Sequence, residues 1–237
     1  MTGLLLEVSC LALGLGAGAV APLAARHILH ALAVSYGLEP SALWLRPDIA
    51  RDWVPSVLCA IACGALALVL LQRLGTSPLI GFVAAACYVL LILSLIDLHA
   101  RLLPDFLTVP MLVAGLVINS TDALVTLPSA LLGAALGYAA LWAARQLSMR
   151  TWRRAEGIGL GDAKLLAALG AWLGWGPVLE ILIAASIAAC VVGAVQTRLR
   201  ATAAGQILAF GPFISAAGMV ALLTWPFSPA EVLATLI

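Results

Sequence analysis

Two aspartates at the ends of long apolar runs have the residue type and placement expected of a catalytic pair. Asp97 closes one apolar run, and Asp162 opens another one 65 positions later. A carboxyl group inside a hydrophobic segment is costly, so its presence there suggests a function. Two carboxylates that share one site hold a single proton near neutrality, because both cannot ionise cheaply. The ionised partner can take a proton from an attacking water while the other protonates a carbonyl oxygen. The predicted chemistry is therefore acid–base hydrolysis, for which no metal and no cofactor is expected.

Residues beside the two aspartates could support this site. Gly159 and Gly161 precede Asp162 and permit backbone conformations and close packing that other residues prevent. Asp105 suits a turn and the N-cap of the next helix, from which it could also hydrogen-bond near the active acids. Lys164 is predicted to be an interfacial anchor that could instead pair with a carboxylate or a lipid phosphate. We expect all four to position the site rather than to react.

The composition excludes a soluble globular domain. Of the 237 residues, 64% are hydrophobic and only 10% are charged, and the mean hydropathy is +1.13. Soluble domains carry about 25% charged residues. The net charge of +1 does not favour a nucleic-acid partner, and the five cysteines support neither a zinc site nor a disulfide framework. The expected fold class is all-α, a polytopic membrane helix bundle that forms a single membrane domain over residues 1–237.

Hydropathy predicts about eight transmembrane helices, because several stretches approach the roughly 20 apolar residues that cross a bilayer. The polar segment 27–53 between the first two is predicted to be a cytoplasmic loop. The eight expected helices cover residues 4–23, 54–71, 78–98, 107–118, 128–147, 162–174, 178–196 and 207–223.

The basic residues predict which side of the membrane each loop faces. With both termini in the periplasm, every lysine and arginine except Arg73 falls on the inner side, as the positive-inside rule requires. In this topology Asp97 and Asp162 lie at the same depth, at the cytoplasmic ends of their helices. The sequence therefore allows the two carboxyl groups to meet at the cytoplasmic face.

Three short motifs carry a resemblance to a known family. Asp97 is followed by Leu-Pro-Asp-x-Leu-Thr at 103–108, Gly159-Leu-Gly-Asp-x-Lys-Leu covers 159–165, and Phe-Gly-Pro-Phe covers 210–213. Together they resemble the type IV prepilin peptidase family, the bacterial Gly-x-Gly-Asp intramembrane aspartic proteases, over residues 94–218. The resemblance implies that Asp97 and Asp162 are the catalytic aspartates. It also implies removal of the leader peptide from type IV prepilins or type II secretion pseudopilins, in the bacterial cytoplasmic (inner) membrane.

The front of the chain departs from the pattern of that family. Members commonly carry a cytosolic insertion with paired Cys-x-x-Cys motifs between the first two helices, whereas the segment 27–53 contains no cysteine. Many members also methylate the new N-terminus of the processed pilin with S-adenosylmethionine. The missing insertion leaves this second activity in doubt.

Other interpretations of the same residues remain open. Asp97 could be an interfacial acid at a helix end, and Asp162 could simply cap a helix. A proton-coupled transporter would also hold intramembrane acids, although these more often lie near the midplane between internal repeats. A catalytically silent assembly subunit is a third alternative.

Overall fold

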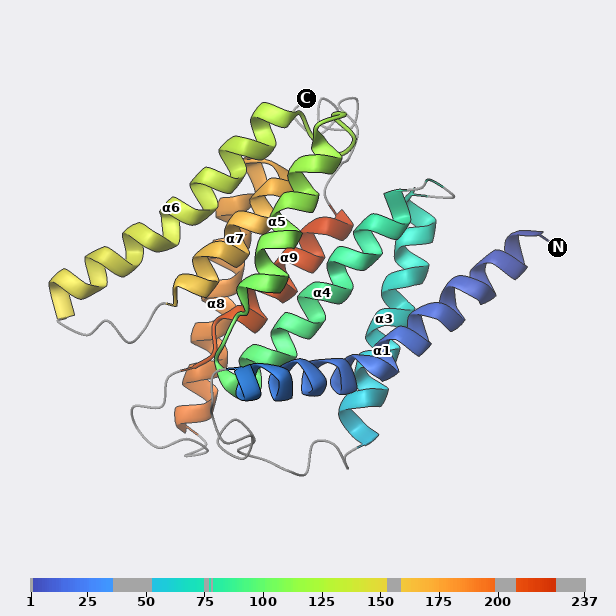
Figure 1. The fold of residues 1–237 in the computed structure, drawn as a ribbon, viewed down its shortest axis with the longest axis horizontal. Helices are drawn as coiled ribbons and strands as arrows, with labels where there is room; N and C mark the ends of the chain where they lie inside the picture. Colours follow the sequence, from blue (N-terminus) through green and yellow to red (C-terminus); the bar gives the residue numbers. More distant parts are fainter. Residues whose placement is uncertain are drawn as a thin grey trace. The chain divides into compact units, whose positions relative to one another are not determined.

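The computed structural model describes residues 2–35, 53–74, 77, 79–152, 159–198 and 208–224. In these residues all regular secondary structure is α-helical, and the chain divides into two compact units, Met1–Leu102 and Leu103–Ile237. The first unit contains α1 (Thr2–Ser35), α3 (Trp53–Leu74) and α4 (Leu79–Ala100). The second contains α5 (Asp105–Asn119), α6 (Leu127–Trp152), α7 (Leu160–Leu173), α8 (Gly176–Arg198) and α9 (Gly211–Thr224) (Figure 1).

The predicted polytopic helical membrane bundle is confirmed. Among the described residues, α1, α3, α4, α6 and α8 are long and apolar enough to cross a membrane. The helices α5, α7 and α9 have only 15, 14 and 14 residues. At 1.5 Å per residue they reach about 21–23 Å, short of the roughly 30 Å hydrocarbon core. The predicted orientation of the loops and termini is not tested by these findings and stays a prediction.

The first helix is longer than the sequence indicates. It was expected to end near residue 23, with a loop from residue 27, but α1 continues past Pro22 to Ser35. The physical reason is a stripe of buried apolar residues that recur every four positions along this part of the helix: Ala21, Ala25, Leu29 and Ala33. Pro22 does not end the helix, although α1 changes direction partway along its length (Figure 1). The rest of the predicted loop, 36–52, lies outside the described residues.

Close backbone contact joins α1 to α3 in the first unit. Gly14 and Gly18 lie one turn apart on the face of α1 that meets α3. A Cβ on Gly14 would lie 2.6 Å from the Cys63 carbonyl oxygen, and one on Gly18 would overlap the Cys59 carbonyl. Small residues at such a spacing let membrane helices approach to backbone contact. The α1–α3 pair is therefore held by packing that a larger side chain would prevent.

In the second unit α7 is the central helix. Eleven of its fourteen residues are buried, and it packs on α5, α6, α8 and α9. Its contact with α6 is made through backbone, since a Cβ on either Gly133 or Gly170 would overlap the carbonyl oxygen of the other. One turn further along α6, a Cβ on Gly137 would lie 2.6 Å from the Leu166 carbonyl oxygen. Protein rather than lipid therefore surrounds α7 on most sides, which explains how so short a helix is accommodated.

Buried hydrogen bonds fix the far end of α7 against α5. Trp172 Nε1 donates to the Met111 carbonyl oxygen at 2.9 Å. Asn119 Nδ2 donates to the Ala171 and Trp172 carbonyl oxygens at 2.9 and 3.2 Å. Asn119 Oδ1 accepts the backbone N–H groups of Leu124 and Val125 at 3.1 and 3.0 Å. One fully buried amide therefore ties the end of α5, the following turn and the end of α7 together.

The glycine crossing between α6 and α7 generates a prediction. Gly170→Ala should lower the free energy of unfolding by about 1–3 kcal/mol, because the added methyl group forces apart two backbones in contact. Unfolding of the purified protein by sodium dodecyl sulfate in mixed micelles, followed by circular dichroism, measures the change. Gly193→Ala is the matched control, since a Cβ there meets no atom within 4 Å. Equal unfolding midpoints for the two variants would contradict the close crossing.

Candidate active site

Asp97 lies in the last turn of α4, three residues before the helix ends at Ala100. It is 5% exposed, and Leu93, Ser94 and Ile96 beside it are also buried. This burial argues against the alternative of a water-exposed interfacial acid. A carboxyl group is among the side chains least often buried without a partner or a function.

The chain turns sharply after Asp97. The Arg101 N–H donates to the Asp97 carbonyl oxygen at 2.9 Å, and Arg101 has a φ of 52°. This left-handed conformation ends α4, because it cannot continue a right-handed helix. His99 Nδ1 contacts the Leu95 carbonyl oxygen one turn back, so that nitrogen is used within the helix itself. The Asp97 side chain is thus carried on a regular helix just before a fixed turn.

Asp162 is the third residue of α7 and is 7% exposed. Its Oδ2 accepts the Gly159 N–H at 3.3 Å. Gly159 rather than Asp162 is the N-cap residue, but the alternative that Asp162 caps the helix is borne out in part, because its carboxyl group reaches back to the Gly159 N–H from the first turn. A carboxylate in this position is stabilised by the helix dipole and satisfies one of the unpaired N–H groups of the helix start. Local backbone geometry therefore orients the Asp162 carboxyl group.

The two glycines of the motif leave room for neighbouring atoms and do not adopt unusual dihedral angles. Gly159 has φ −74° and ψ 145°, which any residue can adopt. A Cβ there would lie 3.3 Å from Asp162 Oδ2, and one on Gly161 would lie 2.8 Å from the Leu103 Cβ. The expectation of special backbone conformations is thus wrong at Gly159, whereas the expectation of close packing is confirmed at Gly161. Gly161 brings the start of α7 against the segment that leads into α5.

Asp105 and Lys164 form an ion pair between the starts of α5 and α7. Lys164 Nζ donates to both carboxylate oxygens of Asp105 at 2.7 Å. The expected N-cap role of Asp105 is wrong, because Pro104 is the N-cap and Asp105 is the first helical residue. Of the three interpretations of Lys164, pairing with a carboxylate is observed, and the interfacial anchor and the lipid phosphate stay untested. The predicted positioning role of both residues thus has a physical basis, since the pair joins the two helix starts.

The rest of the Leu-Pro-Asp-x-Leu-Thr motif builds the first turn of α5. The Leu107 and Thr108 N–H groups donate to the Pro104 carbonyl oxygen at 3.1 and 3.2 Å. Thr108 is 1% exposed, and its Oγ1 also donates to the Pro104 carbonyl oxygen at 3.3 Å. The motif therefore places Asp105 where Lys164 can reach it.

The third motif, Phe-Gly-Pro-Phe, opens α9. The helix begins at Gly211, later than the expected start at residue 207, and the Ile214 N–H donates to the Phe210 carbonyl oxygen at 3.3 Å. Further along α9, a Cβ on Gly218 would lie 2.5 Å from the Leu169 side chain. This motif thus starts a helix that packs against α7, the carrier of Asp162.

The candidate residues are divided between the two compact units. Asp97 belongs to the first, whereas Gly159, Gly161, Asp162, Lys164 and Asp105 belong to the second and gather around the starts of α5 and α7. The approach of Asp97 to Asp162 stays a prediction. Sequence analysis missed Asn119 and Trp172, whose buried hydrogen bonds hold the other end of α7. In the sequence Asn119 begins the polar stretch 119–122, which gives no sign of these distant contacts.

Comparison with known proteins shows which family the same segment resembles. Residues 84–194, which include Asp97 and Asp162, match the family described as the type IV leader peptidase family. A prepilin leader peptidase/N-methyltransferase of Stutzerimonas stutzeri is 40% identical over 166 residues, 70% of this chain and 57% of that protein. Proteins of the same name from Burkholderia pseudomallei (strain 1026b) and Aeromonas hydrophila are 41% and 37% identical over 165 and 191 residues.

This chain matches only part of those relatives. The aligned segments cover 70% and 77% of this chain but only 53% of the Burkholderia protein and 64% of the Aeromonas protein. No solved structure matches the chain.

The ion pair at the helix starts generates a prediction on stability. Lys164 and Asp105 keep 34% and 62% of their side-chain surface exposed, so solvent screens their attraction. A double-mutant cycle of Lys164→Met and Asp105→Asn should give a coupling of about 0.2–1 kcal/mol in the free energy of unfolding. Pairing Lys164→Met with Asp122→Asn, beyond the opposite end of α5, should give none. A much larger coupling, or equal couplings in both cycles, would contradict this assignment.

Proposed function

We propose, from the match of residues 84–194 to the type IV leader peptidase family, that the protein is an intramembrane aspartic endopeptidase. Its catalytic pair is Asp97 with Asp162. Its substrates are type IV prepilins or type II secretion pseudopilins, from which it removes the leader peptide at the cytoplasmic face of the membrane.

The observation that carries the proposal is the burial of both carboxyl groups within the matched segment. Asp97 and Asp162 are 5% and 7% exposed in a chain with only 11 acidic residues. A buried carboxyl group is unfavourable unless hydrogen bonds, charges or a shared proton compensate it. A pair that shares one proton meets this requirement and is at the same time the machinery of an aspartic protease.

Hydrolysis by this pair needs only water and the two carboxyl groups. The ionised carboxylate takes a proton from water as the water oxygen bonds to the carbonyl carbon of the scissile peptide. The protonated carboxyl group gives its proton to the carbonyl oxygen, which produces a neutral tetrahedral diol. As the diol collapses, the ionised carboxylate takes one hydroxyl proton, and the protonated carboxyl group gives its proton to the amide nitrogen. The C–N bond then breaks, and the pair again holds a single proton.

The surroundings of Asp162 support its role in this cycle. The Gly159 N–H and the start of α7 stabilise negative charge on the carboxyl group and hold its orientation. The Asp105–Lys164 pair and the Gly161–Leu103 contact fix the start of α7 against the start of α5. These are positioning residues, which hold the reactive group without touching the substrate. Precise placement of this kind contributes strongly to catalytic rate.

Methylation of the processed pilin is a separate activity, and we propose that this chain lacks it. The relatives are named for both peptidase and N-methyltransferase activities. The segment 27–53 contains no cysteine. The two carboxylates account for hydrolysis but supply no methyl donor site.

Substitution of either aspartate tests the peptidase proposal. Asp97→Asn and Asp162→Asn should each reduce leader removal by at least about 100-fold, because neither variant can hold and exchange the shared proton. Co-expression with a prepilin and separation of precursor from mature protein on a gel measure the loss. Asp122→Asn is the matched control, since Asp122 lies in an exposed turn and accepts only the Leu127 N–H in the described contacts. Unchanged cleavage in both active-site variants, with all variants present in the membrane at equal amounts, would overturn the proposal.

The methylation proposal has its own test. The mature pilin produced by the wild-type protein should carry an unmodified N-terminal amine, which mass spectrometry of its N-terminal peptide detects. A pilin matured by the relative from Stutzerimonas stutzeri serves as the comparison. A methylated N-terminus in the pilin matured by the present protein, in cells without another such enzyme, would show that the activity is retained.

A further inference from the structure

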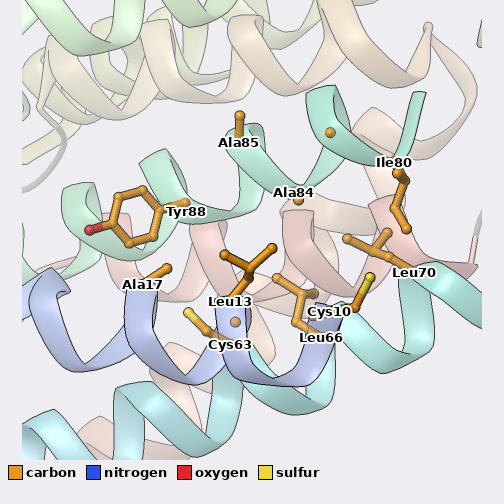
Figure 2. A pocket seen from close by; sticks show the side chains of 13 residues that line it. Cys10, Leu13, Ala17, Cys63, Leu66, Leu70, Ile80, Ala84, Ala85 and Tyr88 are labelled. Atoms are coloured by element: carbon orange, nitrogen blue, oxygen red, sulfur yellow. The ribbon is translucent and has the colours of Figure 1, made fainter. Parts of the chain in front are cut away.

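An apolar cavity that is open to the surface lies in the first unit, between α1, α3 and α4. Its volume is 380 Å³, and residues of all three helices line it (Figure 2). Ile80 and Leu70 stand at one end, Tyr88 and Ala17 stand at the other, and Leu13 lies between them. The cavity therefore extends along the helices rather than across them.

The lining explains both why the space exists and what it can hold. Among the described residues that line it none is charged, and the Tyr88 hydroxyl is the only oxygen-bearing side-chain group. Small residues on the facing helices, Gly14, Gly81, Ala84 and Ala85, leave the space unfilled. A Cβ added at Gly81 would meet no atom within 4 Å, so the space beside α4 is open. An occupant must be apolar, because nothing in the lining would compensate a buried charge.

Volume and length describe the shape of the occupant. An apolar cavity of about 150 Å³ is enough for one benzene ring, so 380 Å³ corresponds to roughly 15 carbon atoms. Ile80 and Tyr88 are eight residues apart on α4, about 12 Å along the helix axis. One leaflet of the hydrocarbon core is about 15 Å deep. The space thus has the carbon content and nearly the length of one acyl chain.

We propose that this cavity binds one acyl chain of a membrane phospholipid. The three surrounding helices are all long and apolar enough to cross a membrane. Ile80 is the second residue of α4, so this end of the cavity lies where the helix enters the bilayer. The lipid headgroup lies at that end, and the chain extends toward Tyr88. This inference does not depend on the proposed peptidase activity.

The driving force follows from the membrane setting. An apolar chain gains no hydrophobic free energy when it moves from lipid into an apolar cavity, because the two surroundings are alike. An empty cavity, however, deprives its lining atoms of dispersion contacts on one side. A neighbouring lipid restores these contacts and is always present at high concentration. The cavity therefore selects by shape, and filling it with protein atoms should displace the lipid.

Photo-crosslinking tests the proposal in vesicles. The full-length protein is reconstituted in phosphatidylethanolamine and phosphatidylglycerol that carries a diazirine in the middle of one acyl chain. After illumination, mass spectrometry maps the modified peptides. Crosslinks should fall on the lining residues, and Gly81→Leu should reduce them at least tenfold because leucine occupies the same space. Ala85→Leu is an independent filling variant, so the result does not depend on one substitution.

Gly16→Leu is the matched control, because a Cβ there also meets no atom within 4 Å and Gly16 does not line the cavity. It should leave the crosslinks unchanged. Circular dichroism and elution as a single peak confirm that each variant compared is folded. Equal crosslinking in the wild type and in both filling variants, or an equal loss in the control, would overturn the proposal. Crosslinks that fall only on residues outside the lining would also overturn it.

Discussion

The burial of α7 is the constraint on which the second unit depends. The helix is too short to cross a bilayer alone, so the unpaired backbone groups at its ends would otherwise lie in the apolar core. Its neighbours therefore surround it, with α6 in backbone contact through Gly133 and Gly170. Trp172 and Asn119 satisfy polar groups at its far end, where lipid could offer no hydrogen bond. Because α7 is fixed at both ends, the carboxyl group in its first turn has one defined place.

Glycine and alanine have opposite consequences in different parts of the chain. Where two helices face each other directly, as at Gly14 with Cys63 or Gly133 with Gly170, a small residue lets the backbones touch. Where three helices meet, as at Gly81 and Ala85, small residues on several faces leave a space that no side chain fills. The same substitution, glycine to a larger residue, therefore has opposite expected effects. It should force helices apart in the first case and fill a cavity in the second.

The polar residues near the proposed catalytic pair divide by what they contact. The Gly159 N–H acts on the Asp162 carboxyl group itself, whereas Asp105 and Lys164 act on the helices that carry it. The exposed ion pair adds little to stability, yet its bidentate geometry sets the distance between two helix starts. The ion pair can therefore add little to stability and still matter for the proposed catalysis, because catalytic rates are sensitive to small displacements of the reacting groups.

The sequence by itself determined the membrane class, because the free energy of transfer of an apolar segment into lipid depends on its own residues and not on tertiary contacts. It also determined the two aspartates as candidates, since an acid beside an apolar run is visible locally. Only the tertiary structure decided where α1 ends, because the stripe from Ala21 to Ala33 is buried by the helices packed on it. It likewise decided the roles of Asn119 and Lys164. Their partners lie 52 and 59 positions away, and local sequence patterns carry no information about contacts made across such separations.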